Sequence, residues 1–407
     1  MARLYQGGAE VHGVIGATFG TIDGAQGGGG GVWTRDTSVF RSGVASWKCD
    51  SGAGNSKVYV SGPVGTINAS RTGYLRGYFQ IPAAPTTTTI ILCFGGSFLV
   101  DLNARLNTSG QVEFLANNTL TGSASSNICG DGLWHRLEIS GDVNASNQWT
   151  RGELLVDGVS LGVWTGAVSR GIIPFWGWCD VAPGANKVIY VDDVVVQDST
   201  GAANNSWPGD SNVILMKPSS DSQVGSWTGG AGGVTNLFDA VNNTPPIGTA
   251  SETDLTQIES ADSSGDNATD EYRGNCGSYT AAGIGASDTI NAITPVISQG
   301  EDVATGTKTG SFGLQANPAQ AYDAFTFGQD AGALGTWGTN WQQINGTVAN
   351  APSVTKGSNL ILAVRKTDTG TRVGSVCFLG AYVDYTPAPS GGPVMRYKKP
   401  HRFLTLR

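Results

Sequence analysis

The chain has 407 residues, and glycine supplies 60 of them, about twice its usual share, whereas charged residues make up only 14%. Together with 11 Trp, 11 Tyr and 13 Phe, this composition excludes a disordered chain, a collagen and a coiled coil. The 24 basic and 32 acidic residues give a net charge of −8, which excludes a general nucleic-acid-binding protein, because affinity for phosphates needs clustered lysine and arginine.

The N-terminal segment, residues 1–32, is rich in glycine and is predicted to be an extended arm, part of which packs on the body. No apolar stretch of signal-peptide length follows Arg3, and no run of ~18 apolar residues occurs anywhere, so we expect neither a secretory leader nor a membrane span. The six cysteines are too far apart for a metal knuckle or a redox pair, and we expect free thiols buried in strands.

Residues 33–199 contain a succession of short apolar or alternating segments separated by turn residues, which predicts a two-sheet antiparallel sandwich or jelly roll. Turns are expected at Asn117-Asn118 and at Asp157-Gly158, the latter as a two-residue hairpin. The predicted strands are 57–60, 74–81, 88–94, 98–106, 111–116, 133–140, 153–156, 159–164 and 187–196.

A polar stretch at 200–212 is predicted to be a linker, and a second antiparallel sandwich is predicted over 213–386. Its expected strands are 213–216, 289–297, 306–316, 360–366 and 373–385, with a short helical turn around 318–325. The stretch 252–271 is acidic and is interpreted as a solvated loop, and residues 387–407 form a short basic tail. The predicted fold is therefore all-β, with two jelly-roll-like β-sandwich domains between a glycine-rich arm and a basic tail.

Three motifs in the first half carry a family resemblance. They read GDGLWHRLE at 130–138, GELLVDGV at 152–159 and VDDV at 191–194. They resemble the strands and the hairpin of concanavalin A-like (laminin G-like) jelly rolls, and the resemblance covers roughly 33–199. It implies that fold and makes sugar binding an expectation.

The second half resembles the C-terminal modules of tailed-bacteriophage structural proteins. The similarity rests on 213–227, Phe238-Asp239, the acidic stretch ending in Asp270-Glu271-Tyr272, and the final strand 378–385. It implies a virion protein, made in the bacterial cytoplasm, whose partners are other virion proteins. Because such proteins act through repetition, a homo-oligomer or multi-copy assembly is expected.

Catalytic patterns are weak in this sequence. Gly158–Gly162 fits G-x-S-x-G, but its serine falls in the second arm of the predicted hairpin and not at a strand-to-helix turn. Glu138 and Glu153 each stand alone on a strand, whereas glycosidases need two carboxyl groups facing one another across the scissile bond. We therefore expect no enzyme activity.

Trp176 and Trp178 share a strand parity and are candidates for stacking on a sugar ring, although such residues also fill sandwich cores and subunit interfaces. Calcium is the one possible cofactor, with Asp101, Asp192 and Asp193 as weak candidate ligands by residue type. A solvated loop or edge position is the alternative interpretation of these three aspartates.

The tail combines basic residues with aromatic ones and is interpreted as a docking peptide that inserts into a partner subunit, with a disordered tail or a nucleic-acid contact as alternatives. The sequence therefore predicts a structural component of a phage particle: a capsid decoration, a fibre, or a tail or adhesion protein. The alternative is a carbohydrate-binding receptor-recognition protein that contacts a host-surface glycan, and a glycoside hydrolase ranks third. The docking residues are Arg396, Tyr397, Lys398, Lys399, Arg402 and Phe403.

Overall fold

The computed structural model describes most of the first half of the chain and a smaller part of the second. Among the described residues, no helix has both the length and the apolar character that crossing a membrane requires. The described residues are 3–7, 31–61, 67, 69–95, 101–171, 174–200, 203–225, 227–229, 236–242, 258–259, 271–301, 308–315, 323–327, 342–345, 349–350, 355–366 and 374–389.

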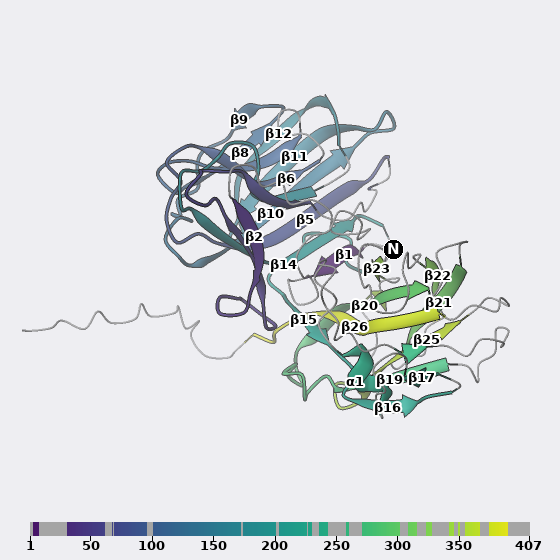
Figure 1. Ribbon diagram of the computed structural model, residues 1–407. Helices are drawn as coiled ribbons and strands as arrows, with labels where there is room; N and C mark the ends of the chain where they lie inside the picture. Colours follow the sequence, from purple (N-terminus) through teal and green to yellow (C-terminus); the bar gives the residue numbers. More distant parts are fainter. Residues whose placement is uncertain are drawn as a thin grey trace, which may run out of the picture.

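The first part of the chain folds into two antiparallel sheets, drawn in purple to teal in Figure 1. The larger sheet has the order β12-β11-β10-β5-β14-β3-β2, with β1 also pairing with β14, and the smaller has the order β4-β13-β6-β7-β8-β9. The strands are β1 Arg3–Gly7, β2 Val32–Asp36, β3 Ser46–Asp50, β4 Val58–Ser61, β5 Thr72–Gln80, β6 Thr89–Phe94, β7 Leu102–Leu106, β8 Val112–Ala116, β9 Thr119–Thr121, β10 Trp134–Val143, β11 Gln148–Val156, β12 Val159–Ser169, β13 Pro174–Trp178 and β14 Val188–Asp198.

Alternation of side chains along each strand explains why these two sheets pack face to face. In β5, Leu75 and Phe79 are buried in the core, while Arg76 and Tyr78 between them point to the opposite face. The same cluster contains Leu92 of β6, Phe114 of β8 and Ile139 of β10, so one apolar core lies between the two sheets.

The second part of the chain forms another pair of antiparallel sheets. One has the order β17-β18-β26-β20-β23, with β15 beside β26 and β24 beside β20, and the other has the order β16-β19-β25-β21-β22. Isoleucine, leucine and valine side chains from β20, β25 and β26 meet in its core. The elements are β15 Asn212–Met216, β16 Ser220–Gln223, β17 Thr228–Gly229, α1 Leu237–Val241, β18 Ile258–Glu259, β19 Glu271–Ser278, β20 Thr289–Glu301, β21 Lys308–Gln315, β22 Asp323–Phe327, β23 Gln342–Asn345, β24 Ala349–Asn350, β25 Asn359–Lys366 and β26 Gly374–Thr386.

The predicted fold class is confirmed: the described chain is all-β with antiparallel β-sandwiches. One local prediction in the second half needs correction. The expected helical turn around 318–325 is wrong over its described part, because β22 begins at Asp323. The helical turn that does occur is α1, held at its start by Asp221, whose carboxylate accepts hydrogen bonds from the backbone N–H groups of Leu237 and Phe238.

The described part of the predicted arm belongs to the body. Strand β1 adds antiparallel to β14, with Gly7 opposite Val194 and Arg3 opposite Gln197. Strand β3 uses the same edge of β14 further along, with Trp47 opposite Val191 and Asp50 opposite Val188. Because both strands run antiparallel to β14, β1 and β3 lie end to end along one edge.

Candidate functional site

The gap between β1 and β3 coincides with an irregularity in β14. The register of β14 against β5 shifts between Asp192 and Val195, and Asp193 takes a left-handed backbone conformation with φ of 49°. A bulge of this kind turns side chains away from their normal faces. Here the Asp193 carboxylate reaches the second sandwich, where it accepts a hydrogen bond from the N–H of Val213 at 2.8 Å, and the adjacent Asp192 carboxylate faces the N–H groups of Arg41 and Ser42.

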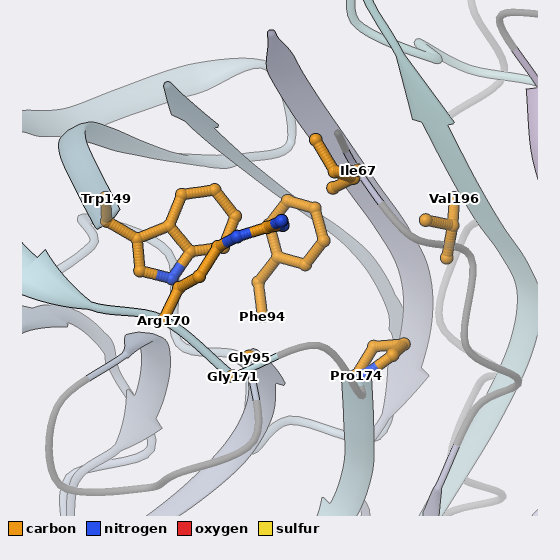
Figure 2. Close-up of a pocket in the computed structure, with 8 residues that line it drawn as sticks. All are labelled: Ile67, Phe94, Gly95, Trp149, Arg170, Gly171, Pro174 and Val196. Carbon is orange, nitrogen blue, oxygen red and sulfur yellow. The ribbon is translucent and has the colours of Figure 1, made fainter. Parts of the chain in front are cut away.

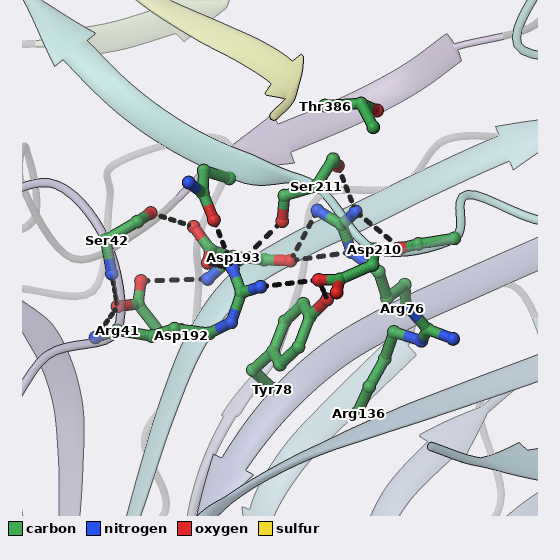
Figure 3. A network of polar contacts seen from close by, with 12 residues as sticks. Arg41, Ser42, Arg76, Tyr78, Arg136, Asp192, Asp193, Asp210, Ser211 and Thr386 are labelled. Atoms are coloured by element: carbon green, nitrogen blue, oxygen red, sulfur yellow. Dashed lines mark hydrogen bonds and ion pairs between the residues drawn. The ribbon is translucent and has the colours of Figure 1, made fainter. Parts of the chain in front are cut away.

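Arg41 and Ser42 meet those carboxylates, as Figure 3 shows. The Arg41 guanidinium lies 2.5 Å from Asp193 and 2.6 Å from Asp210, and it also donates to the side-chain oxygen of Asn212 at 2.8 Å. Burial is the largest single influence and lowers the Arg41 pKa, but the interactions with Asp193, Tyr78 and Asp210 together outweigh it and raise the pKa above its ordinary value. Arg41 thus stays charged and joins β14 to the start of the second sandwich.

A second arginine completes this junction from β5. Arg76 is fully buried, and its guanidinium donates to the carbonyl of Asp193 at 3.1 Å, to the carbonyl of Gly209 at 3.0 Å and to the hydroxyl of Ser211. Ser211 in turn donates to Asp384 on β26. The segment predicted as a linker is therefore a hydrogen-bonded part of the contact between the sandwiches.

An apolar cluster lies beside this polar network. Val195 of β14 packs with Val213, Val296, Phe378 and Tyr382 of the second sandwich, and all five side chains are fully buried. The two sandwiches are thus held together by apolar contact as well as by charge.

The outer face of the larger sheet carries polar and aromatic side chains in rows across neighbouring strands. One row runs from Asp192 through Tyr78 to Arg136, and the next runs from Val195 through Arg76 to Glu138. Residues 203–211 cross this face. The N–H of Gly209 donates to Glu138 at 2.8 Å and Asp210 accepts from the Tyr78 hydroxyl at 2.5 Å, so these inner rows are covered by the chain itself.

Two further rows of the same face lie next to the rows that residues 209–210 cover. In one, Tyr74 lies opposite Ser140, which lies opposite Glu153; in the other, Thr72 lies opposite Asp142, which lies opposite Arg151. Each row thus takes one residue from β5, one from β10 and one from β11, in that order.

Trp207 from the crossing segment lies against Tyr74 in these rows. The two rings are 5.5 Å apart between centroids with an interplanar angle of 62°, and both side chains are partly exposed. Asp142 accepts a hydrogen bond from Thr72 at 2.6 Å, and Arg151 pairs with Glu153 at 2.6 Å. Burial and the nearby Asp142 charge raise the pKa of Tyr74. We name Tyr74, Trp207, Asp142, Arg151 and Glu153 the aromatic–polar patch.

The tryptophans singled out from the sequence lie elsewhere. Trp176 and Trp178 belong to β13, are fully buried and belong to the first core, where the Trp176 ring is 5.6 Å from that of Trp47. Neither ring is open to solvent, so the prediction of a sugar-stacking platform at these two residues is wrong, and their alternative interpretation as core residues holds. Residues two apart on a strand share a face, and Gly177 between them, with φ of 121°, leaves no room for a side chain because a Cβ there would lie 2.6 Å from the Val58 carbonyl oxygen.

The candidate calcium ligands are occupied by protein donors. Asp192 accepts hydrogen bonds from the N–H groups of Arg41 and Asp193, and Asp193 binds Arg41 and Ser42. Asp101 accepts from the Trp149 indole at 2.8 Å and from the N–H of Gly171 at 2.9 Å. Within the described part of the chain, no group of three or more His, Cys, Asp or Glu side chains could hold a metal ion.

The residues of the jelly-roll motif form a clasp. His135 places Nδ1 2.8 Å from Asp157 and Nε2 3.1 Å from Asp131, and Asp157 also accepts from the N–H of Arg136 and from Asn127. Burial opposes the charged imidazole, but hydrogen bonds to Asp157 and Cys129 raise the His135 pKa to about 11. The motif thus ties the loop before β10 to the β11–β12 turn.

A small cavity lies at one end of the first sandwich, shown in Figure 2. Phe94, Trp149 and Arg170 line it, and Arg170 lies over the Trp149 ring at 5.8 Å. Its enclosed volume is about 10 Å³, which holds about one water molecule. It is too small for a sugar.

The remaining sequence predictions concern the cysteines and the tail. Cys49, Cys93, Cys129 and Cys179 are buried free thiols, as expected, and Cys276 is a partly buried free thiol. The docking residues of the tail, 396–403, and the acidic stretch 252–271, apart from β18 and Glu271, lie outside the described residues.

Comparison with known proteins gives low similarity throughout. No family model matches the chain, and no curated protein matches it. Among solved structures, it is similar to the endo-β-1,4-glucuronan lyase of the fungus Trichoderma reesei, with 11% identity over 48% of this chain and 95% of that one and a TM-score of 0.36. It is also similar to a carbohydrate esterase of the Shiga toxin-encoding bacteriophage phi24B, with 14% identity over 48% and 97% and a TM-score of 0.33.

A third solved structure extends over both sandwiches. It is the tandem CBM22 domain of Xyn10C from Paenibacillus barcinonensis, with 13% identity over 93% of this chain and 97% of that one and a TM-score of 0.26. Since identity and TM-score are low in every case, neither site nor function is inferred from these similarities.

Proposed function

We propose that the chain is a non-catalytic glycan-binding protein that uses the aromatic–polar patch on its first sandwich. The carrying observation is the partly exposed Tyr74–Trp207 pair beside Asp142, Arg151 and Glu153. Aromatic rings stack on the apolar faces of sugars, and carboxylate and guanidinium groups accept from and donate to their hydroxyls. Both kinds of group occur here within two neighbouring rows of one sheet.

A glycan array with the full chain tests this proposal. Substitution of Trp207 or Tyr74 by alanine is expected to reduce binding at least tenfold, because each removes a stacking surface. Trp134→Ala is the matched control, since Trp134 is a partly exposed tryptophan on the same face but six positions along β10 from Ser140. Binding that survives Trp207→Ala and Tyr74→Ala, or no binding to any glycan, would refute the proposal.

A second function is proposed on a different observation: a structural component of a phage particle that presents this patch. The buried junction supports it, because Arg41, Arg76 and the apolar cluster around Val195 join the two sandwiches by contacts suited to a load-carrying part. The resemblance of the second half to tailed-phage structural proteins points the same way. Immunogold labelling of purified particles tests it, and particles without label would exclude it.

A further inference from the structure

Strand β1 covers a part of the β14 edge that β3 does not reach. Beyond the bulge at Asp192–Asp193, β3 no longer pairs with β14, and β1 takes over this edge with Gln6 opposite Val195 and Gly7 opposite Val194. Without β1, the backbone of Val194–Gln197 on this side of β14 would lose its strand partner. An uncovered strand edge readily accepts another strand.

The same strand also reaches the second sandwich. Gln6 is fully buried, and its side-chain amide donates to the carbonyl of Tyr382 in β26 at 2.8 Å and to the carbonyl of Ala292 in β20 at 3.2 Å. Leu4 packs against the first core. Five residues therefore contact both sandwiches, so the site for β1 is specific for a strand with an apolar side chain and an amide two positions later.

The connection from β1 to β2 is far longer than the distance it spans. Gly7 lies opposite Val194, while Val32 pairs with Asp50, which lies opposite Val188. Six residues of strand correspond to roughly 20 Å. The 24 residues of 8–31 reach roughly 80 Å when extended, so the tether does not require that β1 dock on its own chain.

We propose that residues 3–7 are an exchangeable strand that docks in the β14 site of a second copy of this chain. Exchange of an identical element between copies adds no new contact chemistry, because every hydrogen bond of the docked strand is kept. The proposal is independent of glycan binding. It gives the N-terminal segment a defined role in linking copies.

Isotope-resolved crosslinking of the full chain tests the exchange. A ¹⁵N-labelled chain carrying the photocrosslinker p-benzoylphenylalanine in place of Leu4 is unfolded and refolded together with unlabelled, unmodified chain. We expect labelled N-terminal peptides joined to unlabelled peptides that contain β14. The same crosslinker in place of Leu120, which is half exposed on β9, is the control and should give no such product. Products confined to labelled chains would overturn the proposal.

A shortened tether provides an independent measurement. Deletion of residues 9–30 leaves Gly8 and Gly31 between the strands, which together span at most about 11 Å, less than the distance between the two docking points. We expect this variant to have at least twice the mass of one chain in light scattering. A matched variant in which 9–30 are replaced by 22 Gly/Ser residues should behave like the unmodified protein. A folded, monomeric deletion variant would contradict exchange.

Discussion

At the scale of single residues, the motif that resembles concanavalin A-like jelly rolls has a structural role: its histidine links a loop to a turn. Asp131 and His135 belong to the D-G-x-W-H motif, and Asp157 belongs to the V-D-G motif further along the chain. His135 contacts both aspartates. The spacing in sequence was enough to suggest a jelly roll, because the motif encodes a strand start and a hairpin. The contact between histidine and two carboxylates could not be foreseen, since it depends on how the loop before β10 folds back.

The clasp makes stability depend on pH. Because the His135 pKa rises from its usual 6.5 to about 11 on folding, the folded state holds a proton that the unfolded state releases above pH 6.5. The stabilisation is complete below pH 6.5 and is lost as the pH rises toward 11. Urea unfolding between pH 6 and 10 should show this fall, and His135→Gln should flatten it. An unchanged slope in the variant would assign the pH dependence to other groups.

The tryptophan outcome follows from burial, which parity alone does not reveal. Trp176 and Trp178 share a face, but a shared face is as typical of a core as of a binding platform. Trp207, which no pattern in the sequence marks as a binding residue, is partly exposed and belongs to the segment that crosses the sheet rather than to a strand. The sequence Trp207-Pro208-Gly209 predicts a domain boundary, and only the fold brings Trp207 onto the sheet.

Trp176→Ala is expected to destabilise the protein by about 3–5 kcal/mol, because it leaves a cavity in a packed core. Glycan binding by the remaining folded protein should be unchanged. Trp134→Ala, at a partly exposed position, should cost about 1 kcal/mol or less. Thermal unfolding measures the loss of stability, and the glycan array measures binding. Equal destabilisation by Trp176→Ala and Trp134→Ala would contradict the assignment of Trp176 to the core.

At the scale of elements, strands with strong local signals were predicted well. Apolar runs and alternation gave β6, β8, β14, β25 and most of β26 nearly to their ends. Short or polar strands were missed. Strand β19, with its three residues Arg273, Gly274 and Asn275 in the middle, pairs with β25 through its backbone and has little sequence signal of its own.

The hairpin between β11 and β12 offers a test at this scale. Asp157 and Gly158 have φ values of 51° and 83°, as a type I′ turn requires, and a Cβ on Gly158 would lie 3.0 Å from Arg136. Gly158→Ala should therefore cost about 1 kcal/mol or more in unfolding free energy. Gly357→Ala, with open space around it and no left-handed backbone, should be close to neutral. Similar values for both would argue against the turn geometry.

At the scale of the whole molecule, the sequence predicted two sandwiches but not their contact. The DSTGAANNSWPG stretch has the composition of a free linker, and its backbone hydrogen bonds to Arg76 and Glu138 depend on residues more than seventy positions away. Long-range polar contacts leave no periodic pattern in a sequence. Only the assembled fold identifies Asp193 as a junction residue and not a calcium ligand.

Breaking the junction should affect both sandwiches at once. Asp193→Asn removes the buried one of the two carboxylates that pair with the largely buried Arg41, and it is expected to cost about 3 kcal/mol or more. Calorimetry should then show two unfolding transitions where the unmodified protein shows one. Asp50→Asn is the control, because its ion pair with Lys48 is partly exposed at 3.8 Å and is worth at most about 1 kcal/mol. A single, unshifted transition for Asp193→Asn would show that the apolar cluster alone joins the sandwiches.

The hydrogen bond from Gln6 to Tyr382 spans 376 positions of the chain. During synthesis, β1 therefore leaves the ribosome long before β26, which carries its most distant hydrogen-bond partner. Domains commonly fold as they emerge. Here the first sandwich can close around its own core, but the N-terminal strand is fully held only when β26 follows. Full protease protection of residues 3–7 in ribosome-bound chains should appear only after β26 has emerged, and full protection already in chains ending at residue 300 would contradict this order.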